Sequence, residues 1–178
     1  MKVLRTILII ILALIVLFLI VALFLPSSFS VERSIEINKP VDFVYNTVLD
    51  FEKRTQWDPW VEKDADATTS FELGDSTGVG NTWAWQGEIV GSGNLTVDKV
   101  IPNEKIHSKL VFISPQQMES DVIWKFAPVE NGTKVTWGLA GEVDYPVGRF
   151  FGMMMDGYIG PDYEQGLQSL KQLCENAE

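Results

Sequence analysis

Cysteine and histidine are almost absent from this chain, which has one of each among its 178 residues. A single cysteine, Cys174, excludes an internal disulfide, so the hydrophobic core alone has to hold the fold together. The only histidine, His107, has no cysteine or carboxylate at ligand spacing around it, so we predict no metal site and place His107 on the surface. Cys174 has no partner residues near it in sequence and is predicted to be a buried structural thiol.

Basic residues are also scarce. The chain has 14 Lys and Arg against 24 Asp and Glu, which gives a formal net charge of −10 at pH 7. Such an acidic chain repels phosphate backbones and anionic lipid headgroups, which argues against nucleic-acid binding and against membrane docking through a basic patch. The sequence also lacks a phosphate-binding loop, a Gly-x-Ser-x-Gly nucleophile turn and a recognisable pair of carboxylates. We therefore predict no catalytic residue and no cofactor.

Hydrophobic residues, in contrast, are concentrated at the start of the chain. Residues 6–25 carry no charge and are nearly all Leu, Ile, Val or Phe. As a helix, a run of this length spans roughly 30 Å, the thickness of the hydrocarbon core of a bilayer. Lys2 and Arg5 come before the run, and the positive-inside rule then places residues 1–5 in the cytoplasm and the rest of the chain across the membrane.

We therefore predict a single-pass membrane protein with a transmembrane helix at 6–25, a short tether at 26–30 and one extracytoplasmic domain of residues 31–178. A cleaved signal peptide is the alternative, because Ser28 and Ser30 provide small residues at a plausible cleavage spacing. The apolar run is longer than the usual signal-peptide core of about 7–15 residues, which favours a retained anchor.

The domain begins with a predicted strand and a pair of short helices. Residues 31–38 alternate between apolar and polar side chains, as a half-buried strand does. Pro40 suits the first turn of a helix, and Asn38 suits its N-cap. A second helical piece is expected to start at Asp50. Trp57-Asp58-Pro59 should end it and start an extended segment, because the residue before proline avoids the helical conformation.

The middle of the domain has the pattern of consecutive strands separated by turn residues. Apolar and polar side chains alternate along each segment, which predicts an antiparallel sheet with one apolar face. Asn131-Gly132 is the clearest hairpin signal. The six predicted strands are residues 68–73, 80–87, 94–101, 105–114, 118–127 and 134–143.

The end of the chain changes to helical spacing. From residue 148 onward, apolar residues recur three and four positions apart, which predicts one long helix. Gly160-Pro161 is expected to kink or restart this helix, because proline lacks a backbone donor. Gly152 and Gly157 each cost about 1 kcal/mol in a helix relative to alanine, which indicates close backbone approach or open room beside it.

This order of elements resembles the START-like (SRPBCC) superfamily, in its polyketide cyclase/dehydrase branch. The segments VERSIEINKPVDFVYNTVLDFEKRTQWDPW (31–60) and GRFFGMMMDGYIGPDYEQGLQSLKQLCE (148–175) carry the resemblance, which covers nearly all of residues 31–178. It implies an α+β helix-grip fold, in which a curved antiparallel sheet of about seven strands wraps a long C-terminal helix. A hydrophobic cavity lies between the sheet and that helix in the superfamily.

On such a fold, the apolar face of the sheet and the long helix would surround the cavity. Trp57 and Trp60 would lie at one mouth, where they either contact a ligand or plug the end of the core. Met154 and Met155 either adapt to a ligand or serve as ordinary core filler. The predicted ligand-binding residues are Trp57, Trp60, Trp83, Trp85, Phe112, Trp124, Trp137, Phe151, Met154, Met155 and Tyr158.

We therefore predict a membrane-anchored domain that binds a hydrophobic or lipid-like small molecule. One alternative is an enzyme of the cyclase or dehydrase type, which would need a Tyr, Asp or Glu in the cavity with a perturbed pKa. Another is a filled core, with function in surface contacts to a second membrane protein. The titratable residues considered for the cavity are Tyr45, Tyr158, Tyr163, Glu142, Asp144 and Asp156.

Overall fold

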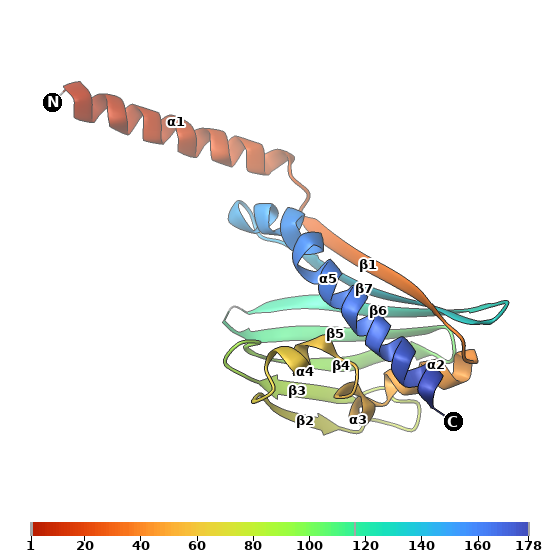
Figure 1. Ribbon diagram of the computed structural model, residues 1–178. Helices are drawn as coiled ribbons and strands as arrows, with labels where there is room; N and C mark the ends of the chain where they lie inside the picture. The colour runs from red at the N-terminus through yellow and green to blue at the C-terminus, as the bar shows by residue number, and fades with distance from the viewer. Residues whose placement is uncertain (1, 116, 178) are drawn as a thin grey trace.

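In the computed structural model, which describes residues 2–115 and 117–177, an N-terminal helix leads into an α+β domain built on a seven-stranded antiparallel sheet (Figure 1). The strand order is β1-β7-β6-β5-β4-β3-β2, so that every neighbouring pair except β1 and β7 is consecutive in the chain. The strands are β1 Ser28–Ile37, β2 Thr68–Glu72, β3 Thr82–Gln86, β4 Ser92–Ile101, β5 Lys105–Ser114, β6 Met118–Val129 and β7 Gly132–Glu142. The helices are α1 Lys2–Phe24, α2 Val41–Leu49, α3 Phe51–Arg54, α4 Pro59–Lys63 and α5 Val147–Asn176. The long helix α5 crosses the sheet, and the helix-grip fold predicted from the sequence is confirmed.

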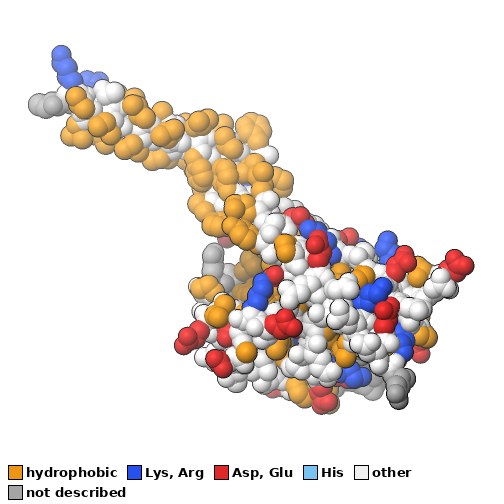
Figure 2. All heavy atoms as spheres, in the orientation of Figure 1, with side chains coloured by type: hydrophobic (Ala, Val, Ile, Leu, Met, Phe, Trp, Pro, Cys, Tyr) orange, Lys and Arg blue, Asp and Glu red, His pale blue; other side chains and the backbone are white. Residues whose placement is uncertain are grey.

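The first helix, α1, extends away from the domain and is almost entirely exposed (Figures 1 and 2). Its most apolar 18-residue window has a mean hydropathy of 3.7, and 6% of that window is buried. A helix of this length and composition can cross a bilayer. A signal sequence has the same properties, so α1 is a candidate for either role.

The short helices differ from the sequence prediction at two of their ends. The N-cap of α2 is Pro40 and not Asn38, whose backbone N–H instead donates to Glu175 of α5 at 2.8 Å. Asp50 does cap α3, because its side chain accepts a hydrogen bond from the Glu52 backbone N–H. The chain is thus drawn toward α5 just before the first of these helices begins.

The expectation that Trp57-Asp58-Pro59 starts an extended segment is wrong. Pro59 is the first residue of a third short helix, α4, and the Asp58 side chain accepts a hydrogen bond from the Trp60 backbone N–H. The physical reason is that an aspartate N-cap followed by proline at the first helical position is itself a helix start. The sequence therefore ends one helical turn and begins another at the same place.

The strands lie close to their predicted positions. The first strand, β1, starts at Ser28 and not at residue 31, and it pairs with β7 along its whole length. The β6–β7 hairpin is present, with Gly132 at a φ of 147°. A Cβ at Gly132 would lie 2.1 Å from the Ile37 carbonyl oxygen, so both the backbone conformation and the close approach require glycine there.

The long helix α5 is continuous through Pro161, so the predicted restart at this residue does not occur. Beside it, a Cβ at Gly160 would lie 2.1 Å from Nη2 of Arg33, which shows that the guanidinium packs directly on the helix backbone. Arg33 pairs there with Asp156 at 2.8 Å and with Glu164 at 2.7 Å. A charged residue on the inner face of β1 is thus neutralised by α5.

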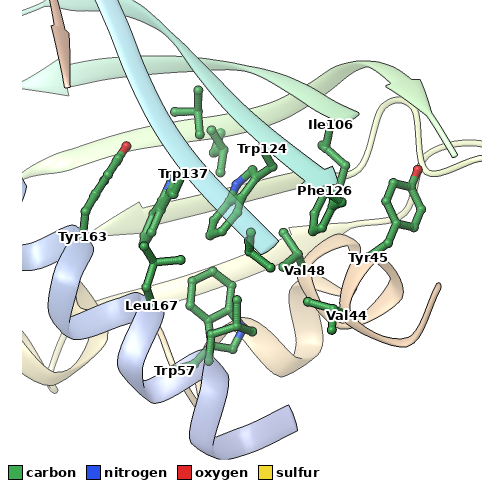
Figure 3. Packing of buried hydrophobic residues seen from close by; sticks show 14 of the residues in the cluster. Val44, Tyr45, Val48, Trp57, Ile106, Trp124, Phe126, Trp137, Tyr163 and Leu167 are labelled. Carbon is green, nitrogen blue, oxygen red and sulfur yellow. The ribbon is translucent and has the colours of Figure 1, made fainter. Parts of the chain in front are cut away.

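The centre of the core is a stack of aromatic rings between the sheet and α5 (Figure 3). The rings of Trp124 and Trp137 stack with centroids 4.5 Å apart, and Trp137 stacks on Tyr163 of α5 at 3.9 Å. Trp57 meets both Trp124 and Trp137 edge-on, at 5.7 and 5.6 Å. Such pairs add about 0.5–1.5 kcal/mol each beyond the burial of their area, so this stack fixes α5 and the α3–α4 segment on the sheet.

Candidate ligand cavity

A cavity of about 520 Å³ lies between the sheet, α4 and α5. Its size falls within the range of about 300–1,000 Å³ that is usual for small-molecule sites. The space between the sheet and α5 is therefore not filled by the protein's own side chains, unlike in the filled-core alternative. Its apolar lining consists of Trp60, Val61, Ala65, Ala67, Trp83, Trp85, Ile89, Val90, Leu95, Leu110, Phe112, Met118, Val122, Trp137, Leu139, Met155 and Ile159.

Six of the eleven residues predicted to bind a ligand line this cavity. Those from the sheet come from alternate positions along their strands, which place them on the inner face. Trp85 and Phe112 meet edge-on, with ring centroids 5.6 Å apart. The six are Trp60, Trp83, Trp85, Phe112, Trp137 and Met155.

The other five predicted residues lie elsewhere. Trp57 and Trp124 are 2% exposed and belong to the aromatic stack of the core, so Trp57 plugs the core while Trp60, three residues later, lines the cavity. Phe151, Met154 and Tyr158 are on the outside of α5, with 58%, 49% and 58% exposure. The helical spacing predicts a single apolar face for this part of the chain. In the structure, the first half of α5 has two apolar faces, an inner one with Met155 and an exposed one with Phe151, Met154 and Tyr158.

Polar groups missed by the sequence reasoning gather at the α4 side of the cavity. Arg54 Nε lies 2.5 Å from Asp58 Oδ2, and the two side chains are 7% and 5% exposed. Arg54 also lies over the ring of Trp57, 5.3 Å from its centroid. The available signal was the spacing of Arg54 and Asp58, four residues apart, together with the Asp-Pro helix start. The buried pair holds the turn that carries Trp60 over the cavity.

Asp64 ties the end of α4 to the turn between β3 and β4. Its Oδ2 accepts hydrogen bonds from the backbone N–H groups of Ile89, at 2.8 Å, and Val90, at 3.1 Å. Lys63 reaches from α4 to Asp162 of α5 at 2.6 Å. The walls of the cavity on α4, on α5 and in the β3–β4 turn are thus linked to one another by polar contacts.

Tyr163 is the one tyrosine among the described residues that lines the cavity. Burial raises the pKa of its phenol well above the usual range, and the nearby Arg54 lowers it by less than burial raises it. At neutral pH Tyr163 is therefore a protonated donor within the cavity and not a base.

The remaining titratable candidates lie outside the cavity lining. His107 is on the outer face of the sheet, where its ring nitrogens lie 3.2 Å from Asp98 and 3.0 Å from Asp121. Cys174 is fully buried. In the part of the chain that the structure describes, no three His, Cys, Asp or Glu side chains come together as metal ligands.

Structures similar to this one include aromatase/cyclases. The Zhui aromatase/cyclase from Streptomyces sp. R1128 shares 11% identity at a TM-score of 0.63, over 83% of this chain and 94% of that chain. The di-domain ARO/CYC StfQ from the steffimycin biosynthetic pathway shares 13% at a TM-score of 0.62, over 83% of this chain and 51% of that one. Protein CV1439 from Chromobacterium violaceum shares 18% at 0.60, over 85% and 99%. At these identities the likeness establishes the fold alone.

No curated protein sequence matches the chain. A family described as "Polyketide cyclase / dehydrase and lipid transport" matches residues 28–175, which is most of the chain and all of the seven-stranded sheet with nearly all of α5. The match agrees with the strand order, the long terminal helix and the cavity between them. The chain therefore belongs to the polyketide cyclase/dehydrase and lipid transport family.

Proposed function

We propose that this protein is a membrane-anchored binding protein for an apolar or amphipathic small molecule. The observation that carries the proposal is the cavity of about 520 Å³ with its predominantly aromatic and aliphatic lining. Each ligand CH₂ buried there would contribute about 0.8 kcal/mol to binding. In this proposal α1 spans the bilayer with residues 1–5 in the cytoplasm, and the domain lies on the other side.

The chemistry of the cavity favours a ligand with a long apolar body and one polar end. Apolar side chains from β3 to β7 surround most of the space, whereas the polar side chains are close to α4. Tyr163 lines the cavity as well, and burial keeps its phenol protonated, so it offers an O–H donor there. A lipid-like molecule with a single carbonyl, hydroxyl or carboxyl group fits this division, because it would satisfy that donor and bury its chain.

The experiment is native mass spectrometry of the full chain in a mild detergent, together with organic extraction of the purified protein. We expect a copurifying apolar molecule, and a thermal shift when a panel of lipids is added to stripped protein. Leu110→Trp should abolish both effects by filling the cavity, whereas Ile101→Trp, at an exposed position outside it, should leave them unchanged. Protein that is always empty and never shifts would contradict the proposal.

A second function, acid catalysis of a cyclisation or dehydration, is favoured by Tyr163 and by the family. Burial keeps the phenol of Tyr163 protonated, so Tyr163 can donate a proton but cannot remove one at neutral pH. The two carboxylates that line the cavity already have partners within the protein. Asp58 pairs with Arg54, and Asp64 accepts hydrogen bonds from two backbone N–H groups. Without a free base among the described lining residues, binding is the function that the geometry supports best.

A further inference from the structure

One end of the sheet carries the opening of the cavity. The β3–β4 turn, the β5–β6 turn and the starts of β1 and β2 share this end, as the antiparallel pairing requires. The lining residues nearest to it include Ile89 of the β3–β4 turn, which is 75% exposed although it lines the cavity. A side chain that both lines the space and meets solvent marks its mouth.

Exposed apolar side chains lie on the elements that meet at this end of the sheet. Ile113 lies at the end of β5 and is 61% exposed. Met154, on α5, is next to Met155, which lines the cavity. We define the mouth patch as Ile89, Ile113, Phe151, Met154 and Tyr158, all of which are at least 49% exposed. Several exposed apolar side chains at one end of a domain that carries a large net negative charge indicate contact with another apolar phase or surface.

The position of α1 identifies that phase. Arg149 holds the end of α1 against the start of α5 by donating to three carbonyl oxygens, those of Ala22 at 3.0 Å, Leu23 at 3.3 Å and Leu25 at 3.1 Å. The rings of Phe18 and Phe150 stack between the same helices, with centroids 4.6 Å apart. Cations at a helix C-terminus stabilise it, so α1 has a defined direction relative to the domain.

That direction is toward the side of the domain that holds the mouth. In Figure 1, α1 leaves the domain toward the left, where the first turns of α5, the end of β5 and the start of β6 also lie. In Figure 2, the apolar surface of α1 continues onto the adjoining part of the domain. A bilayer crossed by α1 therefore faces the end of the sheet that carries Ile89 and not the end that carries the β6–β7 hairpin.

We propose that the mouth patch inserts into the surface of the bilayer that α1 crosses, so that ligand enters the cavity directly from the lipid leaflet. This rests on the proposed function, since it assumes that α1 spans the membrane and that the cavity binds a ligand. The contact is apolar, because a domain of this negative charge is repelled by anionic headgroups. It should therefore form on zwitterionic phosphatidylcholine membranes and change little with salt.

The test uses the full chain in phosphatidylcholine liposomes, with single cysteines introduced by Ile89→Cys, Ile113→Cys and Met154→Cys. Each is labelled with the environment-sensitive dye NBD and quenched by lipids that carry a nitroxide high on the acyl chain. The native Cys174 is fully buried, and unsubstituted protein controls for its labelling. Ile101→Cys is the matched control, because this isoleucine is 50% exposed and lies at the opposite end of β4.

We expect strong quenching at the three mouth positions and background quenching at residue 101, with little change between low and high salt. Equal quenching at all four positions, or none at the mouth, would overturn the proposal. A second readout is loading of stripped protein from liposomes, followed by mass spectrometry. Ile113→Glu should slow loading from the bilayer but not binding in detergent, and Ile101→Glu should change neither.

These readouts separate this inference from the proposed function. Ligand bound in detergent without quenching at the mouth would refute the docking and leave the binding function intact. Quenching at the mouth in protein that never binds a ligand would refute the binding function and leave the docking intact. Protein that fails to float with liposomes would refute the anchor itself, and the docking with it.

Discussion

Replacing Asp58 with alanine is expected to lower the free energy of unfolding by about 4–6 kcal/mol. Its carboxylate faces Arg54 at 2.5 Å with both side chains buried, and it also accepts the Trp60 backbone N–H at 3.0 Å. Breaking a buried ion pair by removing one partner costs about 3–5 kcal/mol, because an uncompensated charge is left in the interior. Loss of the N-cap of α4 adds about 1 kcal/mol.

Two further variants separate these contributions. Asp58→Asn keeps a good N-cap but leaves Arg54 without its counter-charge, so it should cost about 3–5 kcal/mol. The double variant Arg54→Met with Asp58→Asn removes both charges and keeps the cap. It should lie within about 1–2 kcal/mol of the wild type, the remaining loss being the contact of Arg54 with the Trp57 ring.

The assay is urea unfolding of the full chain in a fixed nonionic detergent at pH 7, followed by tryptophan fluorescence. The double variant should be more stable than either Asp58→Asn or Arg54→Met alone, because each single variant leaves one buried charge without its partner. Single variants that each cost less than about 1 kcal/mol would show that water reaches the pair and that it behaves like an exposed one. A double variant whose cost equals the sum of the single costs would show that the two charges do not interact.

Three other predictions test the helix and its buried groups. Gly166→Ala should cost about 1–3 kcal/mol in urea unfolding, because its Cβ would lie 2.8 Å from the Trp137 ring, whereas Gly157→Ala, with nothing within 4 Å, should gain up to about 1 kcal/mol. Burial raises the pKa of Tyr163, so the stability that its protonated phenol contributes is complete below the unfolded pKa of about 10 and falls as the pH rises above it. Tyr163→Phe should therefore lose less stability at alkaline pH than the wild type, as measured by urea midpoints from pH 8 to 11. Burial also raises the pKa of the Cys174 thiol, which should react with Ellman's reagent only on unfolding, and rapid labelling of native protein would contradict this.

The regular elements could be predicted from the sequence because their patterns are local. The alternation of apolar and polar side chains predicts the strands, and the inner position of Trp83 and Trp85 follows from it directly. The helical cost of Gly152 and Gly157 predicts either close approach or open room beside the helix, and the structure shows close approach to Val143 at Gly152 and open room at Gly157. Local rules fail where two signals compete: Trp57-Asp58-Pro59 predicts a helix end, whereas in the structure Asp58 caps a helix that starts at Pro59.

The composition of the cavity wall could be predicted only in part, because it depends on contacts between distant segments. Asp64 lines the cavity because the β3–β4 turn folds back onto α4, and nothing near residue 64 in sequence indicates that turn. Met154 and Met155 are adjacent on an apolar stretch, and only the rotation of α5 against the sheet decides which one faces inward. Sequence periodicity marks a helix as amphipathic but does not fix that rotation when apolar residues cover more than one face.

The division of α5 into two halves explains why a cavity exists at all. Its fully buried residues all lie from Gly160 onward, where glycines at 160 and 166 bring the backbone close to Arg33, Pro59 and Trp137. Before Gly160, only Met155 and Ile159 of this helix line the cavity. The helix is thus held tightly at one end by the aromatic stack and stands away from the sheet at the other. The aromatic stack that stabilises the fold and the wall of the cavity share Trp137 and Tyr163, whereas Trp57 and Trp124 belong to the stack alone and Met155 and Ile159 to the wall alone.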